Sequence, residues 1–330
     1  MRSPSPHISS TNVAGAHRIR FGLHFWDLPR PSWKDRVRRY ERLGFSSITF
    51  TDHQVVPQWE PMAALAAVAA TTESIRLGTL VLDMGLRNPV LTAKAAATLE
   101  VLSNGRLELG LGAGYVAQNF AATGVPFKRA GDRIARLEES LMLMRNLWSE
   151  TSTTMHGRFF DVVDAPMVLR ETVMPTVLIG GGGPKVMHLG GRTADIVSMI
   201  PRQDTGEWSA KASIADSTLE RMSEKARWVR ESAQEAGRDP SGVELHTMVV
   251  RTIVGDDVGD AIAKEAADTG VPVTAIEDSS LYLTGTGAQI RDRLRYWQAR
   301  TGLSYFSIFD PGEDQIEYLA EQVVAPLRKA

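Results

Sequence analysis

The sequence has no cysteine among its 330 residues. This absence excludes disulfide bonds, thiolate zinc sites, cysteine nucleophiles and iron–sulfur clusters. It fits a reducing cytoplasm, which is the location that we expect. Long hydrophobic runs are lacking too, because no apolar run reaches the roughly 20 residues of a transmembrane helix. We therefore expect no membrane partner.

An excess of charge of either sign is also lacking. Lysine and arginine number 37 against 39 aspartates and glutamates, which gives a net charge of −2 at pH 7. No broad basic surface follows, so nucleic acid is a poor partner. The H-E-x-x-H and G-x-S-x-G patterns and clustered carboxylates are missing as well. These absences exclude zinc proteases and α/β-hydrolases, and we expect no metal.

The N-terminal segment is rich in serine, proline and glycine and reads MRSPSPHISSTNVAGAH. It lacks the apolar centre of a secretory signal peptide. We expect residues 1–17 to be a flexible leader. Residues 18–330 are expected to form one domain, because α/β barrels of this length fold as one.

Strand-like and helix-like segments alternate along that domain. Eight apolar segments are expected to be strands, at residues 18–25, 46–53, 75–82, 106–112, 176–180, 194–199, 243–254 and 304–309. Residues 132–148 have apolar residues at helical steps of three and four, and a long charged helix is expected at 208–237. The count of eight favours a (β/α)8 TIM barrel with insertion segments over a doubly wound sheet. Functional residues of such a barrel follow the C-terminal ends of its strands.

A run of four glycines follows the fifth expected strand and precedes a helix that begins at Pro184. The N terminus of a helix has unpaired N–H groups and a partial positive charge, and amides without side chains can approach an anion closely. We interpret the run as a phosphate cradle, to which Lys185 could add a cation. The cradle residues are Gly180, Gly181, Gly182 and Gly183. The alternative is a flexible turn without a ligand.

The segment 110–115, GLGAGY, looks like a dinucleotide-binding fingerprint. Its third glycine is misplaced for G-x-G-x-x-G, and we expect no clean helix after it. We interpret Gly112 and Gly114 as glycines at a strand end that leave room for a flat ligand.

Histidines follow two of the expected strands. Asp52 and His53 end the second strand, where Asp52 could orient a His53 that exchanges protons near neutral pH. The alternative is a purely structural pair. His24 closes the first strand near Trp26, an aromatic that could stack on a flat ring or fill the barrel mouth. These residues indicate a phosphate-bearing ligand but no particular reaction.

Several long blocks resemble, in order, the bacterial luciferase-like superfamily, and most closely its coenzyme F420-dependent oxidoreductase branch. The blocks are residues 75–115, 124–148, 175–199 and 282–309. The resemblance implies a (β/α)8 barrel that binds FMN or the deazaflavin F420 at its mouth. It also implies a small-molecule substrate and a homodimer.

The resemblance also implies roles for individual residues. His53 would lie beside the reacting ring, and Trp59 would stack nearby. The Leu80–Val81 peptide bond would be cis and face the cofactor, and the glycine run would bind the cofactor phosphate. Tyr115 stands where some members carry glutamate, which argues against a sugar-phosphate dehydrogenase. His53 or Tyr115 is then expected to be the catalytic residue that handles the proton.

Three functions stay open. The first is hydride transfer between F420 and an organic substrate, with reduction of an activated C=C or C=N bond expected. The second is an FMN-dependent monooxygenase that uses O2, and the third is a non-catalytic flavin-binding barrel. Aromatic residues of the insertions predict an apolar or aromatic substrate. They are Phe120, Phe127, Phe159, Phe160 and Tyr282.

Overall fold

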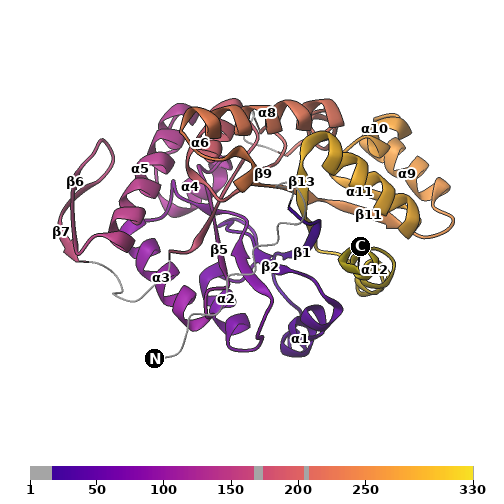
Figure 1. The fold of residues 1–330 in the computed structure, drawn as a ribbon, viewed down its shortest axis with the longest axis horizontal. Coiled ribbons are helices and arrows are strands. Elements are labelled where there is room, and N and C mark those ends of the chain that lie inside the picture. The colour runs from indigo at the N-terminus through magenta and orange to yellow at the C-terminus, as the bar shows by residue number, and fades with distance from the viewer. Residues whose placement is uncertain (1–16, 167–173, 204–207, 330) are drawn as a thin grey trace.

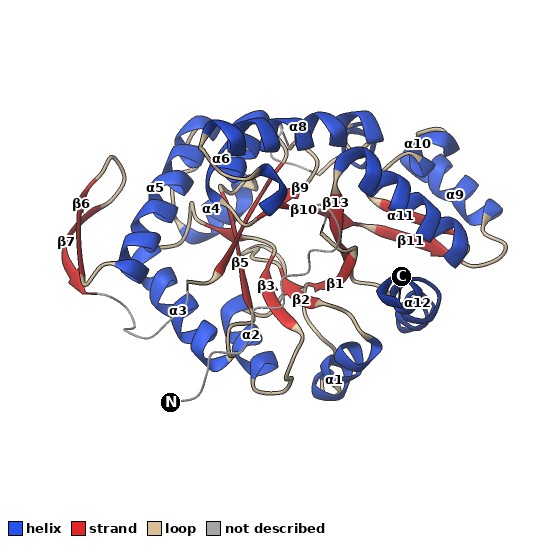
Figure 2. Cartoon of the chain, viewed as in Figure 1, coloured by secondary structure: helices blue, strands red, loops and turns tan. Residues whose placement is uncertain are grey.

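Eight parallel strands form a closed barrel in the computed structural model, which describes residues 17–166, 174–203 and 208–329 (Figure 2). The strands are β1 (Arg20–Phe25), β2 (Ser47–Phe50), β3 (Arg76–Thr79) with its continuation β4 (Leu82–Asp83), β5 (Leu107–Gly112), β8 (Thr176–Gly181), β9 (Ile196–Met199), β10 (Glu244–Val249) and β13 (Leu303–Phe309). Pairing of β3 with β5 closes the ring. The expected (β/α)8 barrel is confirmed. The expected leader lies outside the described residues except for His17.

Helices cover the outside of the barrel (Figure 1). They include α1 (Trp33–Leu43), α2 (Pro61–Ala69), α3 (Pro89–Leu102), α5 (Ala130–Ser149), α6 (Pro184–Thr193), α8 (Leu219–Glu235), α11 (Gly287–Thr301), α12 (Glu313–Leu319) and α13 (Ala325–Lys329). Local sequence explains their ends. The Asn88 side chain accepts hydrogen bonds from the first amides of α3, and α1 ends at Gly44 with φ 89°, which glycine adopts easily.

The core lies between the strands and these helices. Strand residues such as Leu23, Ile48 and Leu109 are fully buried. Helix α5 presents Leu137 and Leu141 to the same cluster, as its periodicity predicted. Burial of this continuous apolar surface is the main stabilising contribution to the fold. No helix in the described part of the chain is both long and apolar enough to cross a membrane.

The structure departs from the sequence-based expectation at three elements. The seventh expected strand is divided, because β11 (Arg251–Val254) leaves the barrel and pairs with β12 (Tyr282–Gly285). The expected helix at 208–237 is also divided, into α7 (Ala210–Ala215) and α8, because the Thr218 side chain caps a new helix start. Helix α4 (Ala117–Thr123) forms where no clean helix was expected. The apolar run at 243–254 and the charged run at 208–237 are continuous in the sequence, so neither predicts where its element is divided.

Two insertions lie at the edge of the barrel. Strands β6 (Ser152–His156) and β7 (Asp161–Pro166) form an antiparallel hairpin that projects from the body, at the left of Figure 1. Helices α9 (Gly259–Thr269) and α10 (Val273–Glu277) pack beside β12 in a small second apolar cluster. The Leu80–Val81 peptide bond is cis, as the family resemblance implied.

Candidate active site

A cavity of about 720 Å³ lies at the C-terminal ends of the barrel strands. Its walls come from residues that follow β1, β2, β3, β5, β8 and β9, together with the ends of β10 and β13. Nearly all of the expected site residues line it. They are His24, Asp52, His53, Leu80, Val81, Gly112, Gly114, Tyr115, Gly180, Gly181, Gly182, Gly183, Pro184 and Lys185.

Trp59 is the expected site residue that does not line this cavity. It immediately precedes Glu60, the cap of α2, and its ring packs against Phe50 at 6.2 Å and Trp33 at 6.0 Å between ring centroids. The tryptophan beside His53 is instead Trp26, with 5.5 Å between ring centroids. Trp26 therefore lines the cavity beside His53, whereas the loop after β2 directs Trp59 toward the core.

His53 is half-buried at the cavity wall. Its Nδ1 lies 3.0 Å from the side-chain nitrogen of Asn119, and Tyr115 approaches it edge-on with 6.2 Å between ring centroids. Burial lowers the pKa of His53, although the nearby Asp52 carboxylate opposes this effect. His53 is consequently neutral at physiological pH.

The Asp52 side chain forms an ion pair with Arg87. Its carboxylate accepts two hydrogen bonds from Arg87, at 2.7 and 2.8 Å, and one from the Asp83 backbone N–H at 3.0 Å. These bonds connect the ends of two neighbouring strands, so Asp52 orients the wall of the cavity. The expected direct link from Asp52 to the His53 ring is absent from the hydrogen bonds of the described residues, and Asn119 makes that link instead.

Three further ionisable side chains of the cavity have shifted pKa values. Burial raises the pKa of Asp83 to about 6, and the neighbouring Asp52 acts in the same direction. Burial lowers the pKa of His24 to about 3, and the His24 Nδ1 hydrogen-bonds Thr49 Oγ1 at 2.9 Å. Burial also raises the pKa of Tyr115. His24 and Tyr115 are thus uncharged at neutral pH.

Close approaches of neighbouring atoms require glycine at several cavity positions, but not at Gly183. A Cβ on Gly112 would lie 2.5 Å from Val81, and one on Gly114, whose φ is +73°, would lie 2.3 Å from the Asp83 carboxylate. A Cβ on Gly182 would lie 2.5 Å from the Arg202 backbone nitrogen, whereas one on Gly183 would meet nothing within 4 Å. Gly183 is therefore open toward the cavity.

The turn between β8 and α6 fits an anionic group. Among the described residues, the N–H groups of Gly182 and Gly183 have no backbone acceptor. They lie at the N terminus of α6, where Lys185 also lines the cavity. Unpaired amides, a helix N terminus and a cation together form an anion site. A phosphate-bearing cofactor such as F420 or FMN fits this set of donors.

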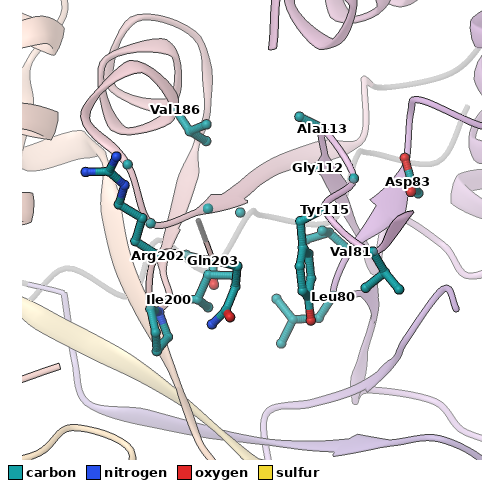
Figure 3. Close-up of a pocket in the computed structure, with 18 of the residues that line it drawn as sticks. Leu80, Val81, Asp83, Gly112, Ala113, Tyr115, Val186, Ile200, Arg202 and Gln203 are labelled. Atoms are coloured by element: carbon teal, nitrogen blue, oxygen red, sulfur yellow. The ribbon is translucent and has the colours of Figure 1, made fainter. Parts of the chain in front are cut away.

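Much of the remaining cavity wall is apolar. Figure 3 shows Tyr115 and Gln203 on opposite sides of the central space, with Ile200 beside Gln203. Trp26, Phe309, Met248 and Val250 also line it. The five aromatic residues of the insertions named in the sequence analysis are not among the lining residues, so they do not form the cavity wall. Phe120, for example, packs against Phe127 with 5.0 Å between ring centroids.

Sequence reasoning missed Asn119, and nothing along the chain indicates its role. It is 66 residues from His53, and it approaches His53 only because α4 packs against the loop after β2. Asp83 ends β4, but the raised pKa of its carboxyl depends on its tertiary environment.

Comparison with known proteins gives a consistent result. A sequence model of the family described as luciferase-like monooxygenase matches residues 29–304. An F420-dependent glucose-6-phosphate dehydrogenase from Kribbella flavida is 28% identical over 88% of this chain and 92% of its own length. Another from Amycolatopsis mediterranei is 35% identical over 48% of this chain, and that alignment spans about half (49%) of the relative.

A solved structure has the same fold. It is an F420-dependent secondary alcohol dehydrogenase in complex with an F420–acetone adduct, with a TM-score of 0.76 and 20% identity. The alignment covers 94% of this chain and 99% of that one. At this level of identity the likeness concerns the fold of the barrel.

Proposed function

Because this chain belongs to the luciferase-like monooxygenase family, we propose that it is an F420-dependent oxidoreductase. The observation that carries the proposal is one cavity lined both by the glycine turn and by His53. The F420-dependent relatives support the choice of cofactor. The substrate is a small organic molecule.

The glycine turn would hold the cofactor phosphate through the amides of Gly182 and Gly183, with Lys185 nearby. Val81 would face the cofactor ring, since its side chain fills the space that Gly112 leaves. F420, when bound, supplies hydride chemistry at C5 of its deazaflavin ring. Trp26 and Phe309, whose rings meet edge to face, would form an apolar wall beside His53.

Among the side chains that line the cavity, we propose His53 and Tyr115 as the hydrogen-bond donors to the substrate. Both are half-buried and both are neutral at pH 7, because burial lowers the pKa of His53 and raises that of Tyr115. We propose reduction of an activated C=C or C=N bond, in which a donor stabilises the charge that develops on the substrate. Tyr115 and the apolar wall support a substrate other than glucose 6-phosphate.

The experiment is a comparison of cofactors with the purified protein. We expect F420 to bind with a dissociation constant in the micromolar range or below, and FMN at least tenfold more weakly, as measured by fluorescence. The second candidate function, an FMN-dependent monooxygenase, is favoured by the description of the family. Tight FMN binding without F420 binding would establish that candidate instead.

Activity separates an enzyme from a cofactor-binding barrel. With reduced F420, we expect turnover of conjugated carbonyl compounds or imines. The absorbance of the oxidised F420 that forms measures this turnover. Oxidised F420 with glucose 6-phosphate is the negative control. Tight F420 binding with no turnover across such a panel would favour the non-catalytic alternative.

The homodimer implied by the family is part of the proposal. Support comes from an apolar groove between α2 and α3, beside which Leu91 and Leu102 are largely exposed. Analytical ultracentrifugation should give twice the monomer mass of 36.1 kDa. A monomer at micromolar concentration would contradict this part.

A further inference from the structure

The side chain of Asn119 is fixed in orientation by two hydrogen bonds of opposite polarity. The Gln54 backbone N–H donates to Asn119 Oδ1 at 2.9 Å, and Asn119 Nδ2 lies 3.0 Å from His53 Nδ1. A backbone N–H can only donate, so the amide oxygen must face Gln54 and the amide NH2 must face His53. Asn119 is 2% exposed, and solvent cannot replace these bonds.

The orientation of Asn119 determines where His53 carries its proton. An amide NH2 group can only donate, so His53 Nδ1 must accept and cannot be protonated. The proton of the neutral ring is then on Nε2. Among the described residues, Nε2 has no hydrogen-bond partner, and His53 lines the cavity. The free N–H of the ring is therefore available to a bound molecule.

We propose that Asn119 is a positioning residue that holds His53 as the Nε2–H tautomer, so that His53 presents a hydrogen-bond donor to the cavity and not a base. Protonation of the ring would place Nδ1–H against the Asn119 NH2 group, and Asn119 therefore opposes the imidazolium form. Asn119 and burial therefore act in the same direction, because burial also lowers the pKa of His53.

The other groups around His53 do not favour a different tautomer or a charged ring strongly enough to oppose Asn119. Asp52 precedes it and favours a charged ring, but the Asp52 carboxylate is paired with Arg87. His24 is neutral at working pH, and Tyr115 approaches through its ring edge. Helix α4, which carries Asn119, has no charged residue in its sequence AQNFAAT.

The tautomer restricts the substrate, and this step rests on the proposed function. A neutral Nε2–H suits an acceptor atom such as the oxygen of an α,β-unsaturated carbonyl compound. In its reduction, the substrate gains a hydride at carbon from the reduced deazaflavin and a proton from water. The charge that develops on oxygen in between is stabilised by the Nε2–H donor. Oxidation of an alcohol would need an unprotonated nitrogen at that place.

Nitrogen-15 NMR of the full chain, labelled at histidine and without cofactor, tests the tautomer directly. Long-range proton–nitrogen spectra distinguish a protonated ring nitrogen from an unprotonated one, and the signals that His53→Gln removes identify His53. We expect Nε2 protonated, Nδ1 unprotonated and a pKa below 6.5. A wild-type ring protonated at Nδ1 would overturn the proposal, whether or not F420 binds.

Asn119→Asp is the matched variant, because it keeps the shape and replaces the NH2 donor with an acceptor. We expect the proton to move to Nδ1 and the pKa of His53 to rise by about one unit or more. Asn119→Ala, which only removes the donor, should raise the pKa less. Asn119→Ala also provides the test of Asn119 if Asn119→Asp fails to fold. An unchanged tautomer and pKa in the folded variants would overturn the role of Asn119.

Discussion

At the scale of single residues, the cavity is defined by how burial changes ordinary side chains. His24, His53 and Tyr115 are all neutral at pH 7, and Asp83 is partly protonated near pH 6, because each has lost much of its solvent. The site therefore works with uncharged donors more than with charges. The carboxylate next to His53 in the sequence, Asp52, is paired with Arg87.

His53→Ala should lower kcat with F420 by about 10²–10³-fold, because one donor to a developing charge is lost. His53→Gln should recover part of the loss, since a glutamine amide can also donate. Steady-state kinetics with a conjugated carbonyl substrate would measure both. A change confined to KM would show that His53 only binds the substrate.

Asp83→Asn should change the pH dependence of stability. The pKa of Asp83 is about 6 in the folded protein against 3.8 for the free side chain. The folded state then binds more protons between these values, and stability falls as the pH rises through this window. The free energy of unfolding of the variant should not show this decrease, which amounts to about 1–3 kcal/mol in the unchanged protein. Urea unfolding at pH 4.5 and 7.5 measures it.

The matched control for that variant is Asp292→Asn. Asp292 is largely exposed on α11 and forms a surface ion pair with Arg295. It should leave the pH dependence of unfolding close to that of the unchanged protein. A similar flattening by both variants would mean that Asp83 is not the responsible group.

At the scale of elements, the turn between β8 and α6 combines two requirements. Gly182 must be glycine because the backbone after β9 approaches it, whereas Gly183 faces open space. Sequence reasoning recognised the run of glycines as a candidate anion site. It could not separate the packing role of one glycine from the ligand-facing role of the next.

Gly182→Ala and Gly183→Ala should therefore behave differently. The first places a Cβ 2.5 Å from the Arg202 nitrogen and 2.6 Å from the Ile200 oxygen, so it should lower Tm by several degrees. The second should leave Tm nearly unchanged but weaken cofactor binding about tenfold, because its methyl group would face the phosphate. Thermal melts and fluorescence titrations would measure both. Unchanged F420 affinity in Gly183→Ala would contradict the cradle.

At the scale of the whole molecule, charged residues cross the interior of the barrel below the cavity. Arg20 of β1 donates to Glu244 of β10 at 2.6 and 2.7 Å and to Glu108 of β5 at 2.9 Å. Arg76 of β3 donates to Glu108 at 2.6 Å. This network connects strands that are far apart in the sequence and links opposite sides of the barrel.

Glu108→Gln should lower the free energy of unfolding by about 3–5 kcal/mol, because Arg20 and Arg76 lose a buried partner. Asp268→Asn, which breaks an exposed pair with Lys264 on α9, should cost no more than about 0.5 kcal/mol. Chemical denaturation measures both. Equal effects would show that the barrel network contributes no more than a surface pair.

The sequence by itself determined the barrel, the position of the cavity at the strand ends and many of the residues that line it. Apolar segments of strand length alternate with helical periodicity, and a (β/α)8 barrel places every strand end on one face. That is why His24, His53, Tyr115 and the glycine run could be brought together without coordinates.

Only the tertiary structure decided what these residues do to one another. The packing of loops and short helices decides three features. It places Trp26, and not Trp59, beside His53, it takes β11 out of the barrel, and it brings Asn119 into contact with His53. Sequence spacing carries no information on such contacts, and burial and hydrogen-bond polarity arise only once distant segments meet. For that reason the place of the site was predictable, whereas the protonation of its central histidine was not.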